Sequence, residues 1–201
     1  VMALTRLGLN QSINLATNTT GSLNLTSQVT GALPVANGGT ALTSGFVNGG
    51  AIKEIDQWRL TTSFSGDAEP IASNWERVDT AGQGYLGTGM SESSGVFTFP
   101  STGIWLVTYT ASFNFNGDAR FQENYISIAG TKVSQQYSFV TNNGEGGANY
   151  SNGTTSTTVD VTNTGTQTVT LSITASQSGS NTNGESNKNR TFATFMRLGD
   201  T

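Results

Sequence analysis

The strongest structural signal in the sequence is a regular alternation of side-chain types over residues 104–115. From Trp105 to Phe115 every second residue is aromatic, Val or Ala, whereas Thr, Ser and Asn take most positions between them. Successive side chains of a β-strand point to opposite faces of the sheet, so a period of two predicts a half-buried strand. The row that we expect in a hydrophobic core includes Trp105, Tyr109 and Phe113.

Other short segments rich in β-forming residues follow the same pattern. Clusters of Gly, Asn, Ser and Pro separate these segments, and no segment shows a convincing helical period. Many short strands joined by such turns are typical of a β-sandwich. The fold class we predict is therefore all-β, an antiparallel jelly-roll β-sandwich. The further strands expected are 95–99, 125–128, 137–140, 168–176 and 191–198.

Two missing residue types exclude most catalytic classes. The chain has no His and no Cys, so it lacks a Ser-His-Asp triad, a thiolate nucleophile and the usual ligands of zinc and iron–sulfur sites. Paired carboxylates remain a candidate, because glycosidases use two Asp or Glu side chains. Asp118 and Glu123 flank Arg120 and form the pair considered, although most surface carboxylates are simply solvated. We predict no enzyme activity and no cofactor, and we assign no residues to a metal site. Oxygen ligands for Ca²⁺ in the loops 114–118 and 142–145 stay an open alternative.

The charge pattern narrows the range of partners. The 201-residue chain has a formal net charge of −4, and its nine basic residues form no stripe, so nucleic-acid binding is not expected. No apolar run approaches the ~18 residues of a membrane span, and membrane insertion is not expected. Residues 82–87 match the dinucleotide pattern GxGxxG, but Thr88 and Gly89 continue a glycine-rich loop where a helix should begin. We therefore attribute that match to the high glycine content.

Composition divides the chain near residue 50. Residues 1–52 contain one charged residue, Arg6, and one aromatic residue, Phe46, whereas residues 53–201 hold all thirteen carboxylates. The first part cannot build an aromatic core of its own. We predict an extended N-terminal segment over 1–52 and one globular domain over 53–201, a length that buries about two-thirds of its unfolded surface.

The N-terminal segment contains a short internal repeat. Residues 14–23 align without gaps on residues 24–33, and both units place Asn, Leu, Thr, Gly and Leu at the same offsets. A ten-residue unit with so few apolar side chains cannot bury them alone. Such repeats gain burial by stacking or by wrapping with identical chains.

Residues 94–105 have the sequence Ser-Gly-Val-Phe-Thr-Phe-Pro-Ser-Thr-Gly-Ile-Trp and lead directly into the long alternating strand. This stretch resembles the signature of the C1q/TNF-like jelly roll, and weaker similarity extends over about residues 53–201. In the resemblance, Pro100 and Gly103 form a tight turn between two antiparallel strands. The positions that carry the signature are Gly95, Phe97, Pro100, Gly103, Trp105 and Tyr109.

Proteins of that family are typically trimers, so the resemblance implies a homotrimer. The second row of the long strand begins with Ile104 and Leu106, and this row can pack against a partner. The polar stretches 142–157 and 176–189 are interpreted as insertions relative to compact family members, so loop functions of the family do not carry over to them.

Residues 25–40 have the sequence Leu-Thr-Ser-Gln-Val-Thr-Gly-Ala-Leu-Pro-Val-Ala-Asn-Gly-Gly-Thr. This stretch resembles one found in tail and head fibre proteins of bacteriophages, where it lies near the virion-proximal end or along the shaft and is usually trimeric. A segment almost without charge suits this role, because three chains can bury Leu and Val together without burying charges. The residues expected to contribute to attachment or to a trimeric shaft are Leu15, Leu23, Leu25, Val29, Leu33, Pro34 and Val35.

The two resemblances together imply a bacteriophage virion structural protein, assembled in the cytoplasm of the bacterial host. The expected form is a short trimeric tail or head fibre. Its N-terminal segment would attach to other phage structural proteins of the capsid, portal or tail, and its head would bind a glycan or protein of the host surface. A capsid decoration or cement protein without receptor binding is the alternative. A glycan-hydrolysing fibre head is a third hypothesis.

Overall fold

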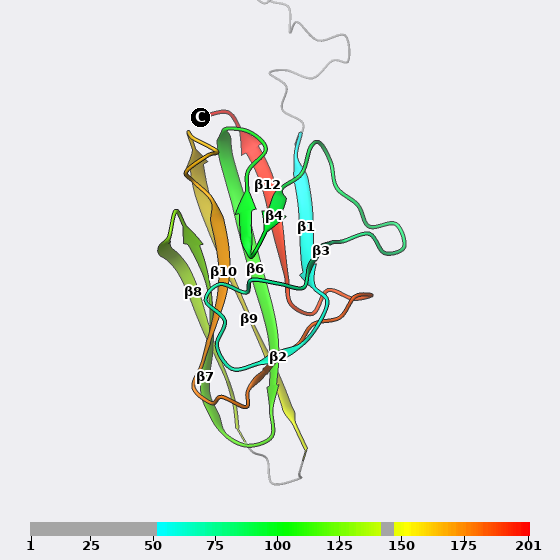
Figure 1. Ribbon diagram of the computed structural model, residues 1–201, viewed down its shortest axis with the longest axis vertical. Helices are drawn as coiled ribbons and strands as arrows, with labels where there is room; N and C mark the ends of the chain where they lie inside the picture. The colour runs from blue at the N-terminus through cyan, green and yellow to red at the C-terminus, as the bar shows by residue number, and fades with distance from the viewer. Residues whose placement is uncertain (1–51, 142–146) are drawn as a thin grey trace, which may run out of the picture. The chain divides into compact units, whose positions relative to one another are not determined.

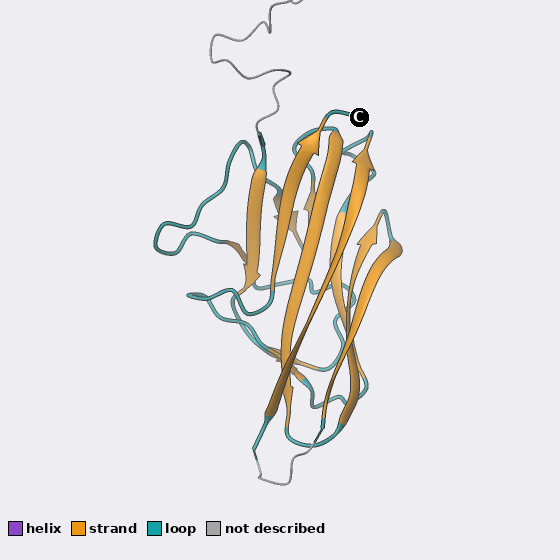
Figure 2. Ribbon diagram, turned by 180° about the vertical axis from the view of Figure 1, so that it is seen from behind, coloured by secondary structure: helices purple, strands orange, loops and turns teal. Residues whose placement is uncertain are grey.

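The computed structural model describes residues 52–141 and 147–201. The chain divides into two units, Val1–Gly50 and Ala51–Thr201, and the described residues belong to the second. The described part contains strands and loops but no helix, and its strands form two antiparallel sheets (Figures 1 and 2). The predicted all-β antiparallel sandwich is confirmed for this part. The predictions for Leu15, Leu23, Leu25, Val29, Leu33, Pro34 and Val35 lie outside the described residues.

The larger sheet has seven strands and is called the β6 sheet here. Its members are β1 (Ile55–Leu60), β2 (Phe64–Ser65), β3 (Trp75–Arg77), β6 (Gly103–Phe115), β9 (Asn149–Val161), β11 (Asn181–Thr182) and β12 (Phe192–Gly199). Their order is β2-β11-β6-β12-β1-β3, and β9 also pairs with β6. β6 is the central strand, because β9 pairs with its whole length while β12 and β11 pair with successive parts of it.

The second sheet has five strands and is called the β7 sheet. It contains β4 (Ser91–Ser93), β5 (Val96–Thr98), β7 (Ala119–Ile128), β8 (Thr131–Val140) and β10 (Val169–Ala175). Their order is β4-β5-β10-β7-β8, with every pair antiparallel. The connection from β5 to β6 therefore passes from one sheet to the other.

The alternating row of β6 lies in the core, as its pattern predicts. Trp105, Tyr109 and Phe113 are at most 1% exposed. The ring of Phe99, just after β5, lies 5.1 Å from that of Trp105. The side chains of the other row are half-buried on the outer face of the same sheet. The core of the sandwich thus forms between the aromatic row of β6 and the inner face of the β7 sheet.

Two signature glycines occupy positions that other residues would strain. Gly95 has a φ of 80°, and a Cβ there would lie 2.4 Å from the carbonyl oxygen of Ile71. Gly103 has a φ of 137°, and its Cβ would lie 2.5 Å from the oxygen of Gly199. Positive φ and close backbone approach both favour glycine. However, the turn over Pro100–Gly103 does not join two paired strands, because β5 and β6 belong to different sheets.

The stretch 142–157, interpreted as an insertion relative to compact family members, includes strand residues from Asn149 onward, and its standing as an insertion stays a prediction. These residues belong to β9, which with β6 is one of the two longest strands described, at 13 residues. The stretch 176–189 contains the short strand β11, which pairs with both β6 and β2. Strands β7 and β8 also begin earlier than predicted, at Ala119 and Thr131. In each case polar side chains take the positions where apolar ones would have marked a strand.

The interior of the sandwich is polar over part of its length. Gln122 and Asn124 of β7 are each 2% exposed and point inward between two apolar clusters. The Gln122 side-chain amide donates to Thr182 Oγ1 at 2.8 Å, and that of Asn124 approaches the Tyr109 carbonyl oxygen at 3.4 Å. Within the described residues, the buried hydroxyl of Tyr109 has no hydrogen-bond partner.

Replacing Tyr109 with phenylalanine is expected to raise the free energy of unfolding by about 1 kcal/mol, because an unpaired buried hydroxyl costs stability. Burial also raises the pKa of Tyr109, so this hydroxyl stays protonated at ordinary pH. Urea unfolding followed by tryptophan fluorescence, at one chain concentration, measures the change. A clear loss of stability would show that the hydroxyl is hydrogen-bonded in solution and would contradict the prediction.

Candidate functional surfaces

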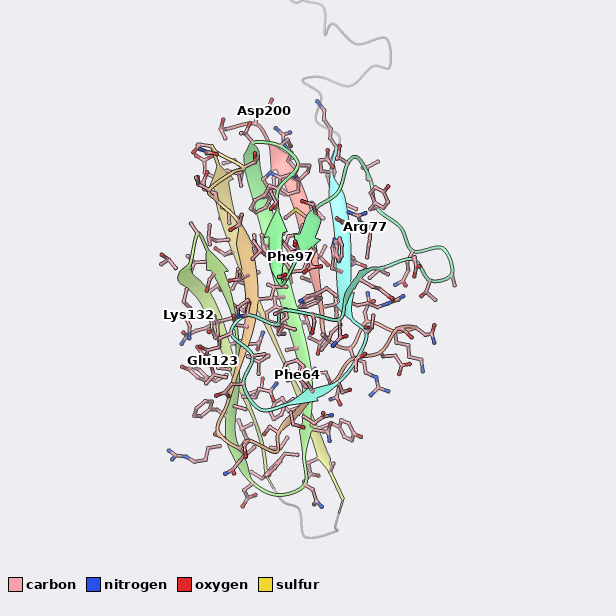
Figure 3. The ribbon with its side chains drawn as sticks, viewed as in Figure 1. Phe64, Arg77, Phe97, Glu123, Lys132 and Asp200 are labelled. Atoms are coloured by element: carbon pink, nitrogen blue, oxygen red, sulfur yellow. The ribbon has the colours of Figure 1, made fainter. Side chains whose placement is uncertain are left out.

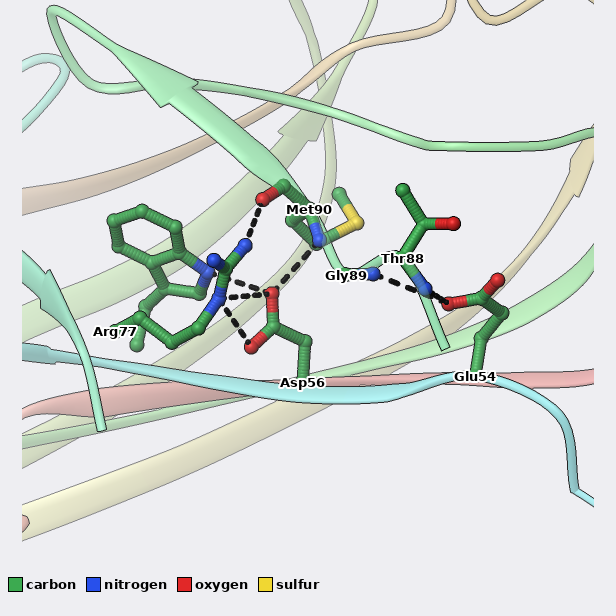
Figure 4. A network of polar contacts seen from close by, with 7 residues as sticks. Glu54, Asp56, Arg77, Thr88, Gly89 and Met90 are labelled. Atoms are coloured by element: carbon green, nitrogen blue, oxygen red, sulfur yellow. Dashed lines mark hydrogen bonds and ion pairs between the residues drawn. The ribbon is translucent and has the colours of Figure 1, made fainter. Parts of the chain in front are cut away.

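A buried carboxylate holds the loop that leads from β3 to β4. Asp56 is 1% exposed and accepts hydrogen bonds from the Trp58 indole at 2.9 Å and from the Met90 backbone N–H at 2.7 Å. The Arg77 guanidinium donates to the same carboxylate at 3.0 Å and also to the Met90 carbonyl oxygen (Figure 4). The Cζ atom of this guanidinium lies 5.0 Å from the centre of the Trp58 ring and 4.6 Å from the centre of the Tyr85 ring. The Asp56 carboxylate thus accepts hydrogen bonds from an indole, a guanidinium and a backbone N–H group.

A second carboxylate anchors the same loop. Glu54 accepts from the backbone N–H groups of Thr88, at 2.8 Å, and Gly89, at 3.2 Å (Figure 4). The loop contains the GxGxxG stretch of residues 82–87, and strand β4, not a helix, follows it. A dinucleotide site needs a helix there, so the match has no structural support. Both carboxylates stabilise the loop.

The outer face of the β6 sheet carries an apolar row that runs across three strands. Ile55 of β1 lies opposite Met196 of β12, which in turn lies opposite Leu106 of β6. All three side chains are only half-buried. Ile104 is on the same face of β6, and Leu198 is 51% exposed. We call Ile55, Ile104, Leu106, Met196 and Leu198 the apolar row.

The outer face of the β7 sheet carries an ion pair. Lys132 donates to Glu123 at 2.8 Å, and its ammonium group lies 3.7 Å from the centre of the Tyr125 ring (Figure 3). Burial lowers the pKa of Lys132, but the hydrogen bond to Glu123 and the charge of Glu123 outweigh it, so the pKa is raised. The two charges neutralise each other at this surface.

The two carboxylates considered as a glycosidase pair have different surroundings. Glu123 of β7 is 5% exposed and forms an ion pair with Lys132 of β8. Asp118 lies in the exposed turn between β6 and β7. Nothing in this arrangement identifies Asp118 and Glu123 as an acid and its nucleophile, and the absence of enzyme activity stays a prediction.

Exposed aromatic side chains flank the connection from β8 to β9. Tyr137 and Phe139 of β8 are 51% and 67% exposed, and Tyr150 of β9 is 68% exposed. The Tyr137 ring meets that of Phe121 edge-on, with centroids 5.6 Å apart. Tyr137 and Phe139 share one face of β8, whereas Tyr150 belongs to the β6 sheet. Exposed apolar groups gathered on one face mark interaction surfaces more often than isolated ones do.

No protein-family model matches the chain, and no curated protein matches it. Within residues 52–141 and 147–201, no three Asp or Glu side chains gather in a way that could hold a metal ion. The same residues contain no helix with the length and apolar character needed to cross a membrane.

The structure brings together some of the residues singled out in the sequence and adds others. Gly95, Phe97, Pro100 and Gly103 surround the crossing from β5 to β6, and Trp105 and Tyr109 follow inside the core. Sequence analysis did not single out the Asp56 network or the aromatic side chains of β8. A signal for the latter does exist, since Gln135, Tyr137 and Phe139 alternate with Ser and Gln in one segment.

Proposed function

We propose that this chain is a bacteriophage virion structural protein, a short homotrimeric fibre. Residues 1–52 attach it to the capsid, portal or tail, and the sandwich is a head that binds the host surface. The protein acts by binding, not by catalysis, and assembles into the virion in the bacterial cytoplasm. The similarity of residues 25–40 to phage fibre segments supports this placement.

The strand order supports a C1q/TNF-like jelly roll as the architecture of the head. Along the chain β5, β6 and β7 alternate between the two sheets, and so do β8, β9, β10 and β12. A jelly roll consists of two Greek keys wound over two facing sheets, which requires this kind of crossing. The β5–β6 crossing is also where the signature residues lie.

The apolar row is the observation that carries the trimer. Monomeric proteins rarely leave apolar side chains in a continuous row on a sheet face, and such a row is typical of a subunit interface. The row alternates along β6 with the aromatic core residues, so one strand supplies both surfaces. A trimer also multiplies the weak affinity of a single host-binding site through effective concentration.

The full chain is expected to have three times its 21.0 kDa mass by light scattering after gel filtration. Leu106→Asp is expected to reduce this to the mass of one chain, because association would bury three unpaired carboxylates together. Val133→Asp is the matched control, because Val133 is 47% exposed on β8 of the other sheet. This control variant is expected to remain trimeric.

A monomeric wild-type chain would contradict the trimeric fibre. If Leu106→Asp remained trimeric with an unchanged β-type circular dichroism spectrum, the apolar row would not be the interface. Virions that lack the chain separate a host-binding fibre from a decoration protein. Loss of adsorption with unchanged heat resistance supports the fibre, whereas loss of heat resistance with unchanged adsorption supports the decoration protein.

A further inference from the structure

The outer face of β8 presents aromatic and amide side chains in one row. Gln135, Tyr137 and Phe139 are all exposed and alternate with residues that point the other way. The Gln135 amide donates to the Tyr137 hydroxyl at 3.2 Å, and Phe121 of β7 supports the Tyr137 ring from the side. We call Phe121, Gln135, Tyr137 and Phe139 the β8 face.

The surroundings of the β8 face are almost free of net charge. Between Lys132 and Asp160 the sequence contains one charged residue, Glu145, among many Ser, Thr, Asn, Gln, Gly and Tyr. Lys132 itself is neutralised by Glu123. Rings combined with amides and hydroxyls resemble the chemistry of antibody binding loops, in which Tyr supplies contact area and small polar residues supply hydrogen bonds. On β7, Arg120 is exposed directly before Phe121, in the stretch of β7 that faces Phe139. Apart from this one cation the face offers rings, amides and hydroxyls, which complement an uncharged partner rich in hydroxyls better than a charged polymer.

A peptide strand fits this place less well. β8 is the last strand of the β7 sheet, so its outer edge would be the position for an added strand. However, Ser134 of β8 contacts Thr155 at 2.5 Å and donates to the Ser156 carbonyl oxygen at 2.9 Å, so β9 lies against this edge. The aromatic face, not the strand edge, is therefore the accessible feature.

The position of the β8 face suits an outward-facing surface. The end of β8 and the start of β9 lie opposite the start of β1 and the C-terminus within the sandwich (Figure 1). Residues 1–51 join the sandwich at the β1 end. If that segment attaches the protein to the virion, the end of β8 lies at the end of the sandwich away from the point where the segment joins (Figure 1). This step rests on the proposed function.

We propose that the β8 face binds an uncharged oligosaccharide. The C–H face of a sugar ring stacks on Phe139 and Tyr137, which removes apolar surface of both partners from water. The Gln135 amide and the Tyr137 hydroxyl exchange hydrogen bonds with sugar hydroxyls at the ring edge. The three copies in a trimer convert a weak contact into a stable one.

Saturation-transfer NMR titrations of the full chain test this proposal. The probes are maltohexaose, cellohexaose, chitohexaose and mannohexaose, with a hyaluronan hexasaccharide as the anionic comparison. At least one neutral probe is expected to bind, and Phe139→Ser is expected to weaken that binding about tenfold or more, since it removes the stacking ring. Tyr150→Ser is the matched control, because Tyr150 is 68% exposed against 67% for Phe139 but belongs to the other sheet. It is expected to change the affinity less than about twofold.

Three outcomes would overturn the proposal: no neutral probe binds, only hyaluronan binds, or Phe139→Ser binds as tightly as the wild type. Light scattering on the same samples separates this failure from failure of the fibre. A trimer that binds no neutral probe removes the glycan-binding assignment of the β8 face and leaves the trimeric fibre standing. A monomer removes the trimeric fibre, whatever the sugars do.

Discussion

Replacing Asp56 with alanine is expected to lower the free energy of unfolding by about 3 kcal/mol. The substitution leaves the buried N–H of Met90 and the indole N–H of Trp58 without their acceptor, which lies 2.7 Å from the first and 2.9 Å from the second. It also removes the partner of Arg77, whose side chain is 31% exposed and so keeps part of its hydration. That exposure holds the loss at the lower end of what breaking a buried ion pair costs. Urea unfolding at a fixed chain concentration measures it.

Glu185→Ala is the control for removing a carboxylate. Its oxygen lies 3.4 Å from Arg190, and both side chains are about one-third exposed or more, so its loss is expected to change stability by less than about 0.5 kcal/mol. Asp56→Asn keeps an acceptor oxygen of the same size and is expected to lie between the two. Equal losses for Asp56→Ala and Glu185→Ala would show that the network does not stabilise the fold.

Strand β6 could be predicted almost residue by residue, and the reason is physical. It is central in its sheet, so one face meets the core for its whole length while the other stays half-buried. This geometry selects an apolar residue at every second position, and the period of two then identifies both the strand and its core row. The same argument holds for β10, whose Val169, Leu171 and Ile173 are completely buried.

The first part of strand β9 could not be predicted, because the interior that it faces is polar, whereas Val159 and Val161 at its end lie in the apolar core. Gly153 and Thr155 point toward the layer that contains Asn124 and Ser138. A Cβ on Gly153 would lie 2.6 Å from both the Asn124 amide oxygen and the Ser138 hydroxyl, so only glycine fits. Where a strand pairs with a polar layer, Gly, Ser and Thr replace the apolar alternation, and the sequence then resembles a loop.

The candidate surfaces were even less accessible to sequence reasoning. Asp56 meets Arg77 and Met90, which are 21 and 34 residues away along the chain. Only the pairing of β1 with β3 and the path of the following loop bring them together. The β8 face depends on a strand that begins at Thr131, six residues before the predicted start at Tyr137. Its alternation is visible in the sequence, but exposure decides between a core strand and a binding face, and the sequence does not record exposure.

Replacing Phe97 with alanine is expected to lower the free energy of unfolding by about 3–5 kcal/mol, the usual cost of removing a buried phenylalanine ring. Phe97 is completely buried on β5 of the β7 sheet. Its ring meets three rings of the β6 sheet, with centroid distances of 5.6 Å to Trp58, 5.4 Å to Trp75 and 5.2 Å to Phe195. The cavity left by the substitution opens where the two sheets meet, so neighbouring side chains can fill it only in part.

Phe139→Ala removes the same side chain from a position that is 67% exposed, and it is expected to change stability by less than about 0.5 kcal/mol. The contrast between the two variants isolates burial from residue type. It also separates stability from binding, because Phe139 is the position at which sugar affinity, not folding, should respond. Similar losses at Phe97 and Phe139 would contradict the sandwich, since only one of these rings lies between the sheets.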